Sequence, residues 1–263
     1  MRRTICGMLP FDTSKPNAAR VYDYMLGGKD NFAADRELAE RMLQIDPGLP
    51  ELARSNRKFV AAVVRRAADA GITQFLDLGA GLPTKPAVHH TARALNEDAR
   101  VAYVDNDPVA VNHASVLLSD GPGVVVAGAD LTSPAEVFSD PAVSSVIDLA
   151  QPVCVILASV LHFIDPETAG RLVRGYAERV PPGSWIALSV GSTDDEELID
   201  RARGSYTISA WNHGPREFTA WLDGLDLVPP GISEARRWTG GIDDSRNDTA
   251  DSWYVLCAAA VKP

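Results

Sequence analysis

The chain has little cysteine and no long apolar run. Its three cysteines, Cys6, Cys154 and Cys257, are far apart, which excludes a disulfide framework, and the last two lie in apolar runs typical of buried strands. Runs such as VCVILASVL fall short of the ~18 residues needed to cross a bilayer. Near the start, Gly7 and Pro10 interrupt the only apolar stretch, which excludes a secretory signal. We therefore expect a cytoplasmic protein with no membrane partner.

Positive charge is also scarce. Lys and Arg number 25 against 35 Asp and Glu, so the formal net charge is −10. Nucleic-acid binding depends on Lys and Arg that displace counterions, and the densest basic cluster, Arg65-Arg66, fits the solvated face of a helix. The histidines form no ligand spacing with the cysteines. We expect no nucleic acid and no metal, and a small molecule as the partner.

Residues 16–71 show helical periodicity. Apolar residues recur there at spacings of three and four and predict three helices, which Gly27-Gly28 and Pro47-Gly48 separate. The cluster YDYMLGGKDNF, from Tyr22 to Phe32, mixes aromatic, charged and glycine residues. We interpret it as part of a lid over a bound ligand. The alternative is a glycine-capped helix whose aromatic side chains pack in the core.

From Gln74 onward, short apolar runs alternate with helical segments. The runs FLDLG, VAYVD, VVVAG, VCVILAS and WIALSV predict a mostly parallel sheet with helices on both faces. The tail differs, because GLDLVPPGISEARRW and DSWYVLCAAAVKP are separated only by a polar loop and are expected to form an antiparallel hairpin. The prediction is one α/β domain over residues 1–263, with an N-terminal helical lid at 16–71 and a Rossmann-like core at 72–263.

Acidic residues and glycines stand where predicted strands end, which is where ligands bind in such sheets. Gly79 and Gly81 follow the first strand, where glycine allows close approach of the backbone, although an ordinary tight turn is the alternative. A dinucleotide loop needs a third glycine, and Pro83 removes an N–H group instead, which argues against a nicotinamide-dependent oxidoreductase.

Two further strands end in acids. Asp105 has the spacing of a residue that accepts hydrogen bonds from a ribose, whereas Asp107 is expected to cap the helix that begins at Pro108 or to share the work of Asp105. Asp130 is placed to meet an exocyclic amine such as that of adenine. A capping role for Asp130 before Ser133 is the alternative.

Four segments resemble, in order, the motifs of the S-adenosylmethionine-dependent methyltransferases with a seven-stranded Rossmann-like sheet. They are DLGAG at 77–81, YVDNDP at 103–108, GAD at 128–130 and ILASVLHFI at 156–164. PNAARVYDYMLGGKDNFAADRE and ARSNRKF resemble an actinobacterial S-adenosylmethionine methyltransferase family formerly catalogued as a domain of unknown function. That resemblance covers nearly the whole chain and implies the fold and the cofactor, but no acceptor.

The resemblance also implies roles for individual residues. Glycines 79 and 81 leave room for the methionyl part, the acid at 105 holds the ribose, and the acid at 130 meets adenine together with the backbone of the residue that follows it. Residues 158 and 159 lie near the sulfonium. The implied cofactor residues at the strand ends are Gly79, Ala80, Gly81, Asp105, Asn106, Asp130, Leu131, Ala158 and Ser159.

Other cofactor contacts remain open. Asp77 either contacts the ammonium of the methionyl end, directly or through water, or only orients the glycine loop. Arg57 or Lys29 could bind the carboxylate of the cofactor, and either could be a surface charge. Tyr22 and Gly28 belong to the expected lid and are predicted to contact the cofactor as well.

Methyl transfer needs mainly alignment and exclusion of water. His162 is the candidate general base, and a structural histidine is the alternative. The fourth strand lacks the Asn/Asp-Pro-Pro-Tyr/Phe signature of base and amide methylation, which favours a small-molecule acceptor. Trp211, Asn212 and His213 either line its pocket or form a packed loop. A noncatalytic S-adenosylmethionine-binding module is the remaining rival.

Overall fold

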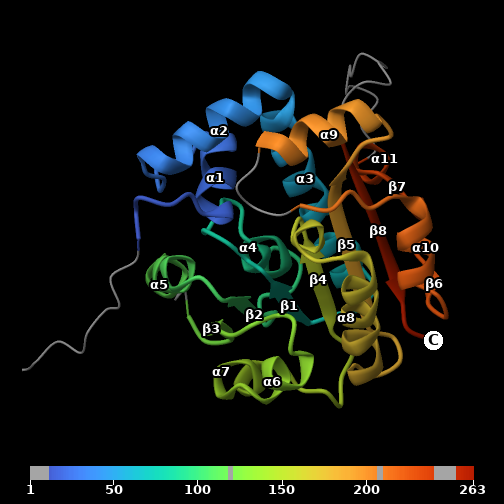
Figure 1. Ribbon diagram of the computed structural model, residues 1–263. Helices are drawn as coiled ribbons and strands as arrows, with labels where there is room; N and C mark the ends of the chain where they lie inside the picture. Colours follow the sequence, from blue (N-terminus) through green and yellow to red (C-terminus); the bar gives the residue numbers. More distant parts are fainter. Residues whose placement is uncertain (1–11, 118–120, 206–209, 240–252) are drawn as a thin grey trace, which may run out of the picture.

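The computed structural model describes residues 12–117, 121–205, 210–239 and 253–263 (Figure 1). Cys6 lies outside these ranges, and Cys154 and Cys257 are buried free thiols. Within the described ranges, eight strands form one sheet in the order β3-β2-β1-β4-β5-β8-β6, with β7 also paired to β8. The strands are β1 (Gln74–Leu78), β2 (Arg100–Asp105), β3 (Val124–Gly128), β4 (Cys154–Ala158), β5 (Trp185–Ser192), β6 (Asp226–Leu227), β7 (Ser233–Glu234) and β8 (Tyr254–Val261).

The predicted mostly parallel sheet is confirmed. Strands β1 to β5 run parallel to one another, and β8 runs antiparallel to β5 along its whole length. The tail forms the predicted antiparallel pairing, but the first partner is split into β6 and β7. Pro229 and Pro230 lie between these two pieces and have no N–H group for the ladder. Two short strands, β6 and β7, therefore take the place of the sixth strand along the chain in the expected seven-stranded sheet.

Helices cover both faces of the sheet (Figure 1). One face packs against α3, α4, α5 and α11, and the other against α6, α7, α8 and α10. The helices are α1 (Ala18–Met25), α2 (Ala33–Ile45), α3 (Leu49–Asp69), α4 (Val88–Arg93), α5 (Pro108–Leu117), α6 (Pro134–Ser139), α7 (Pro141–Val146), α8 (Pro166–Arg179), α9 (Glu196–Ser205), α10 (Pro215–Trp221) and α11 (Ala235–Trp238).

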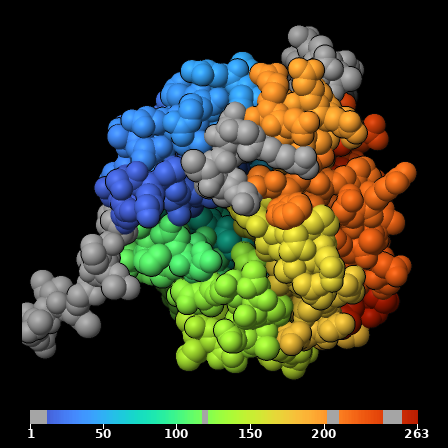
Figure 2. Space-filling view, in the orientation of Figure 1, coloured from blue at the N-terminus to red at the C-terminus, as the bar shows by residue number. Residues whose placement is uncertain are grey.

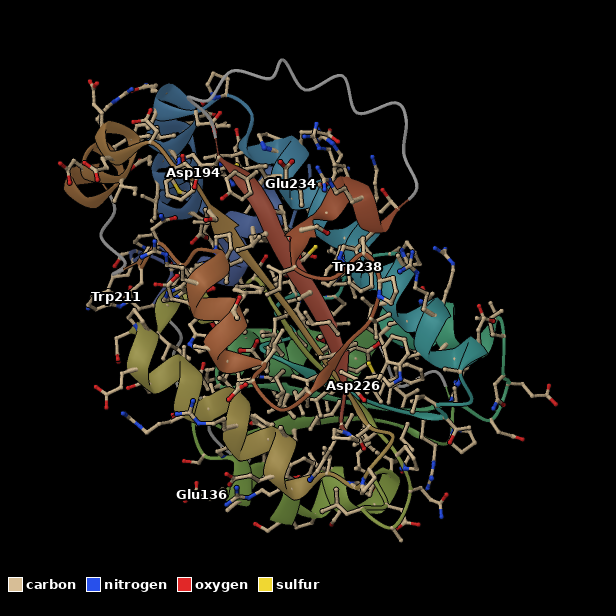
Figure 3. All side chains as sticks on the ribbon, turned by 90° about the vertical axis from the view of Figure 1, so that its right-hand side faces the viewer. Glu136, Asp194, Trp211, Asp226, Glu234 and Trp238 are labelled. Carbon is tan, nitrogen blue, oxygen red and sulfur yellow. The ribbon has the colours of Figure 1, made fainter. Side chains whose placement is uncertain are left out.

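Alternation along the strands decides which side chains face α3. In β1, Leu76 and Leu78 belong to the core on the α8 side, whereas Phe75 belongs to the core on the α3 side. Successive side chains of a strand point to opposite faces, so Asp77 points to the α3 side with Phe75. On that side Trp238 meets the edge of Phe59, with ring centroids 5.3 Å apart, and Figure 3 places it beside β8.

The three predicted N-terminal helices are present, but they belong to two layers. Helix α3 packs on the sheet through its apolar stripe, so it is part of the core although the predicted lid of residues 16–71 includes it. Helices α1 and α2 pack on each other, and α2 also contacts α9. Figure 1 shows these three helices together above one end of the sheet. Of the three helices in the predicted lid, α1 and α2 are thus placed as a cover over this end of the sheet, whereas α3 belongs to the core.

A buried ion pair holds α1 against α2. Arg20 Nε lies 2.8 Å from Asp35 Oδ2, and both side chains are almost fully buried. The Asp35 carboxylate also accepts hydrogen bonds from the backbone N–H groups of Asn17 and Phe32. One carboxylate therefore fixes the start of both helices.

Candidate functional site

A cavity of about 930 Å³ lies at the carboxyl ends of the strands. Its walls come from the loops after β1 to β4 and from α1, α2, α3 and α9, and Figure 2 shows the surface hollowed between the N-terminal helices and the segment after β4. The predicted site residues that line it are Tyr22, Arg57, Asp77, Gly79, Ala80, Gly81, Asp105, Asn106, Asp130, Leu131, Ala158, Ser159 and His162.

Gly28 and Lys29, also predicted to contact the cofactor, do not line this cavity. Gly28 packs so closely on Asp23 that a Cβ atom would lie 2.0 Å from its carboxylate, and that carboxylate binds the N–H of Asp30. Lys29 is exposed. The Gly27-Gly28 pair therefore ends α1 and shapes its turn, and the predicted cofactor contacts of Gly28 and Lys29 stay predictions.

The loop after β1 requires glycine. Gly79 has a φ of +67° and Gly81 a φ of +62°, a backbone region that favours glycine. A Cβ atom on Gly79 would lie 2.3 Å from Val160 Cγ1. The N–H groups of Gly79 and Ala80 both donate to the carbonyl of Val104, which ties the loop to the end of β2.

Asp105 connects this loop to the next one. Its Oδ2 accepts a hydrogen bond from the N–H of Gly81 and its Oδ1 one from the N–H of Asp107, each at 2.8 Å. Burial raises the pKa of Asp105, and the two backbone donors oppose that effect. Each carboxylate oxygen keeps a second lone pair for a ligand in the cavity.

Asp107 has the predicted capping role and a second contact. Its Oδ1 accepts a hydrogen bond from the N–H of Val109 in the first turn of α5. Its Oδ2 accepts one from the side-chain amide of Asn17, which itself caps α1. Asp107 thus links the loop after β2 to the helices above the cavity.

Asp130 lies exposed at the cavity after β3. Its Oδ1 accepts hydrogen bonds from the N–H and the hydroxyl of Thr132, and the N-cap of α6, Ser133, makes no side-chain capping bond. The Asp130 side chain therefore forms a local turn and does not cap α6. The Tyr176 hydroxyl donates to the carbonyl of Leu131 and fixes the same loop.

Asp77 is a buried carboxylate beneath α3, with only 7% of its surface exposed. Burial raises its pKa to about 6, the Arg57 guanidinium acts in the opposite direction, and the neighbouring Asp105 adds to the increase. Arg57 is half-buried and also donates a hydrogen bond to the carbonyl of Pro86. A cationic partner close to such a buried acid would stabilise its ionised form.

A hydrogen-bond network joins α1 to the loop after β4 through Asn56. The Asn56 amide donates to the Tyr22 hydroxyl at 2.9 Å and accepts from the Ser189 hydroxyl at 2.6 Å. The Tyr22 hydroxyl donates to the carbonyl of Ala53, and the Ser189 hydroxyl accepts from the N–H of Ser159. Ser159 has a φ of +57°, so this network supports an uncommon backbone conformation at the cavity wall.

Replacing Asn56 with alanine is expected to destabilise the protein by about 1–3 kcal/mol, because the Tyr22 hydroxyl loses its donor and the buried Ser189 hydroxyl loses its acceptor. Urea denaturation measures the change. Arg54→Ala, an exposed position on the same helix, is the control and is expected to change stability by less than about 1 kcal/mol. Equal losses in the two variants would contradict a supporting role for the network.

His162 lies in a short 3₁₀ turn, Leu161–Phe163, after β4 and lines the cavity. Its Nδ1 is buried and has no hydrogen-bond partner within the part of the chain that is described. Burial, together with the nearby His213, lowers the pKa of His162 to about 4. The ring is therefore neutral at physiological pH and can accept a proton or a hydrogen bond.

The three residues of the loop before α10 have different positions. Trp211 lines the cavity and is exposed, and its backbone N–H donates to the carbonyl of His162 at 2.7 Å. Asn212 also lines the cavity, but its side chain exchanges two hydrogen bonds with the backbone of Thr193. His213 is fully buried, lies outside the cavity lining and bonds the carbonyls of Leu161 and Ile164, so it is a structural residue.

Asn17 and Asn56 were not predicted as site residues from the sequence. Asn56 lies three residues before Phe59 and four before Val60, on the buried stripe of α3. A polar residue on an apolar stripe is a signal that could have identified it. Asn17 carries no such signal, because its contact with Asp107 joins residues 90 positions apart.

No group of three or more His, Cys, Asp or Glu side chains able to hold a metal ion occurs among the described residues. No helix in the described ranges combines the length and apolar character needed to span a bilayer.

Known proteins resemble this chain over nearly its whole length. Residues 8–263 match the family model described as S-adenosyl methyltransferase. A DUF574-family protein from Streptomyces avermitilis is 33% identical, with 96% of this chain and 99% of that chain covered and a TM-score of 0.90. A putative methyltransferase from Thermobifida fusca is 36% identical, covers 95% and 96%, and has a TM-score of 0.87.

More distant structures share the fold alone. Magnesium protoporphyrin IX methyltransferase from Synechocystis, solved with S-adenosylhomocysteine bound, is 15% identical, with 85% of this chain and 94% of that chain covered and a TM-score of 0.51. Among curated proteins, none matches this chain.

Proposed function

The chain belongs to the S-adenosyl methyltransferase family and is an S-adenosylmethionine-dependent methyltransferase, and from that premise we propose that its acceptor is a small molecule bound in the cavity at the strand ends. The observation that carries this proposal is that three carboxylates, Asp77, Asp105 and Asp130, lie at or just after the carboxyl ends of three neighbouring strands and line one cavity with a glycine loop. A volume of about 930 Å³ is at the upper end of the ~300–1,000 Å³ typical of small-molecule sites.

The cavity residues fit the cofactor group by group. S-adenosylmethionine presents an ammonium, a ribose diol and an adenine amine, all of which are hydrogen-bond donors. We assign Asp77 to the ammonium, Asp105 to the ribose and Asp130 to adenine, because carboxylates accept such bonds. Arg57, beside Asp77, is the proposed partner of the methionyl carboxylate.

The remaining predicted residues complete this proposed site. Gly79, Ala80 and Gly81 offer a backbone surface to the cavity, and a side chain at Gly79 would clash with Val160. Asn106 extends the ribose side, Leu131 the adenine side and Tyr22 the cover, while Ala158 and Ser159 lie where β4 ends. We propose that α1 and α2 act as the lid, since Asn17 joins α1 to the loop after β2.

When bound, the cofactor supplies an electrophilic methyl group on a sulfonium. The cavity walls orient the acceptor in line with that group and exclude water. His162 is the proposed catalytic residue: its neutral ring accepts the proton of the acceptor hydroxyl or amine. A cytoplasmic location belongs to the same proposal, because the cofactor is an intracellular metabolite.

Methyl-labelled S-adenosylmethionine tests this proposal. Purified protein is incubated with the labelled cofactor and bacterial extract separated into metabolite, protein and nucleic-acid fractions. Label is expected in the metabolite fraction, together with release of S-adenosylhomocysteine. Label confined to protein or nucleic acid would refute the acceptor class. Binding of the cofactor with no release of S-adenosylhomocysteine would favour a noncatalytic module.

Cofactor affinity is expected to rise with pH through about 6. Below pH 6 the buried Asp77 is protonated and offers no charge to the ammonium, whereas above pH 6 it is ionised. The raised pKa also means that ionised Asp77 costs stability in the free protein, and this cost appears as pH rises from about 3.8 to about 6. Calorimetry between pH 5 and pH 8 measures the affinity.

Asp77→Asn is the matched control for this prediction. It is expected to bind the cofactor more weakly at pH 8 and to lose the dependence on pH near 6, because the amide does not titrate. The free variant is also expected to be more stable than the natural protein at pH 8. An unchanged pH dependence in Asp77→Asn would contradict the role of Asp77.

A further inference from the structure

Among the described residues that line the cavity, the charged ones cluster at one half of the sheet, the half formed by β1, β2 and β3. Asp77, Asp105, Asp107 and Asp130 lie at or just after the carboxyl ends of β1, β2 and β3, and Arg57 on α3 is near enough to Asp77 to act on its pKa. In the sheet order these three strands form one half, while β4, β5 and β8 form the other. The proposed cofactor groups therefore occupy the charged half.

The other half of the lining is uncharged in the ranges that the structure describes. Helix α2 packs against α9, and both helices line the cavity together with the loop that follows β4. Apolar side chains from these elements line the cavity, namely Leu38, Met42, Phe163, Ile164 and Ile199, together with Trp211 from the loop before α10 and Val255 from β8. Transfer of an ionised group into such a wall is costly, so this half favours a neutral ligand.

Aromatic residues form the rim of this apolar half. Phe163 is 40% exposed and Trp211 is 45% exposed, and both line the cavity. Figure 3 shows Trp211 at the outer edge of the molecule, above α8. Exposed aromatic faces at a cavity mouth bind flat rings through stacking or edge contacts. The hydrogen bond from the backbone N–H of Trp211 to the His162 carbonyl keeps this rim next to the candidate base.

We propose that the acceptor is a neutral phenol, whose flat apolar ring lies in the uncharged half of the cavity and whose hydroxyl meets His162. This inference rests on the proposed function. In the reaction, the phenol oxygen bonds to the methyl carbon while the carbon–sulfur bond breaks and leaves its electron pair on sulfur. The hydroxyl proton passes to His162 and then to water. The products are an aryl methyl ether, S-adenosylhomocysteine and one proton.

The basicity of His162 supports a phenol over an aliphatic alcohol. Burial lowers the pKa of His162 to about 4, so the ring is a weak base. A phenol hydroxyl has a pKa of about 10 and is far more acidic than water, whose acidity is closer to that of an aliphatic alcohol. A weak base removes a proton more readily from the more acidic hydroxyl.

Matched pairs of neutral and anionic ligands test this inference. Protein saturated with S-adenosylhomocysteine is titrated with phenol, 2-naphthol and 4-phenylphenol, and with benzoate, 2-naphthoate and 4-phenylbenzoate. At least one phenol is expected to bind about tenfold more tightly than its carboxylate partner. Carboxylates that bind as well as their phenols, or no binding by any phenol, would overturn the inference.

Variants locate the ring and the hydroxyl. Trp211→Ala is expected to weaken binding of the phenol by about threefold or more, whereas Leu227→Ala, a similarly exposed residue on β6, is expected to leave it unchanged. With S-adenosylmethionine, the phenol is expected to yield its methyl ether, and His162→Gln to lower kcat with little change in cofactor affinity. Absence of the ether would refute the phenol, whereas failure to bind S-adenosylmethionine would refute the proposed function itself.

Discussion

Asp35→Ala is expected to lower the free energy of unfolding by about 3–5 kcal/mol. The change leaves the Arg20 guanidinium buried without its charge partner and removes an acceptor from the N–H groups of Asn17 and Phe32. Because α1 and α2 share this carboxylate, the loss is expected first in residues 18–45. Urea denaturation measures the total, and hydrogen exchange followed by mass spectrometry measures the local loss.

Glu51→Ala is the control for this prediction. Glu51 pairs with Arg54 at 2.7 Å, but both side chains are about half exposed, and surface pairs of this kind contribute about 0–1 kcal/mol. Similar losses in Asp35→Ala and Glu51→Ala would show that the buried pair does not hold the lid. In that case the account of how the cavity is covered would fail.

Asp105→Ala is expected to weaken S-adenosylmethionine binding by about 1.5–3 kcal/mol, which corresponds to roughly 10- to 150-fold in Kd. The variant removes the proposed acceptor of the ribose hydroxyls. It also frees the N–H groups of Gly81 and Asp107, so two loops at the cavity lose their common anchor. Isothermal titration calorimetry measures the change.

Asp98→Ala separates this local effect from the loss of a negative charge. Asp98 is exposed and precedes β2, whereas Asp105 ends the same strand. The control variant changes the net charge equally and is expected to bind the cofactor normally. A normal Kd in Asp105→Ala would remove Asp105 from the cofactor site.

Much of the fold could be predicted because it depends on local patterns. Phe75 and Leu76 alternate between two cores as a buried strand requires, and the apolar stripe of α3 follows the helical period. Parallel strands bring their carboxyl ends to one edge, so acids at 77, 105 and 130 were expected to meet there, and all three line the cavity.

The rest depends on contacts between distant segments, which a local pattern does not contain. The apolar residues of α3 repeat at the same helical spacing whether the helix covers a ligand or packs on the sheet. The sequence therefore could not show that α3 belongs to the core. His213 becomes structural only because the carbonyls of Leu161 and Ile164 lie around its ring. The packing of Gly28 could not be predicted for the same reason, since it depends on the Asp23 carboxylate that occupies the space beside it.

Calorimetric titration of the purified protein with S-adenosylmethionine, S-adenosylhomocysteine and NAD tests the central claim most directly. The account predicts that the first two bind and that NAD does not, because Pro83 replaces an N–H group in the loop and Gly79 and Gly81 leave room for a methionyl chain instead. Binding of NAD alone, or of none of the three, would contradict the assignment of this cavity as an S-adenosylmethionine site.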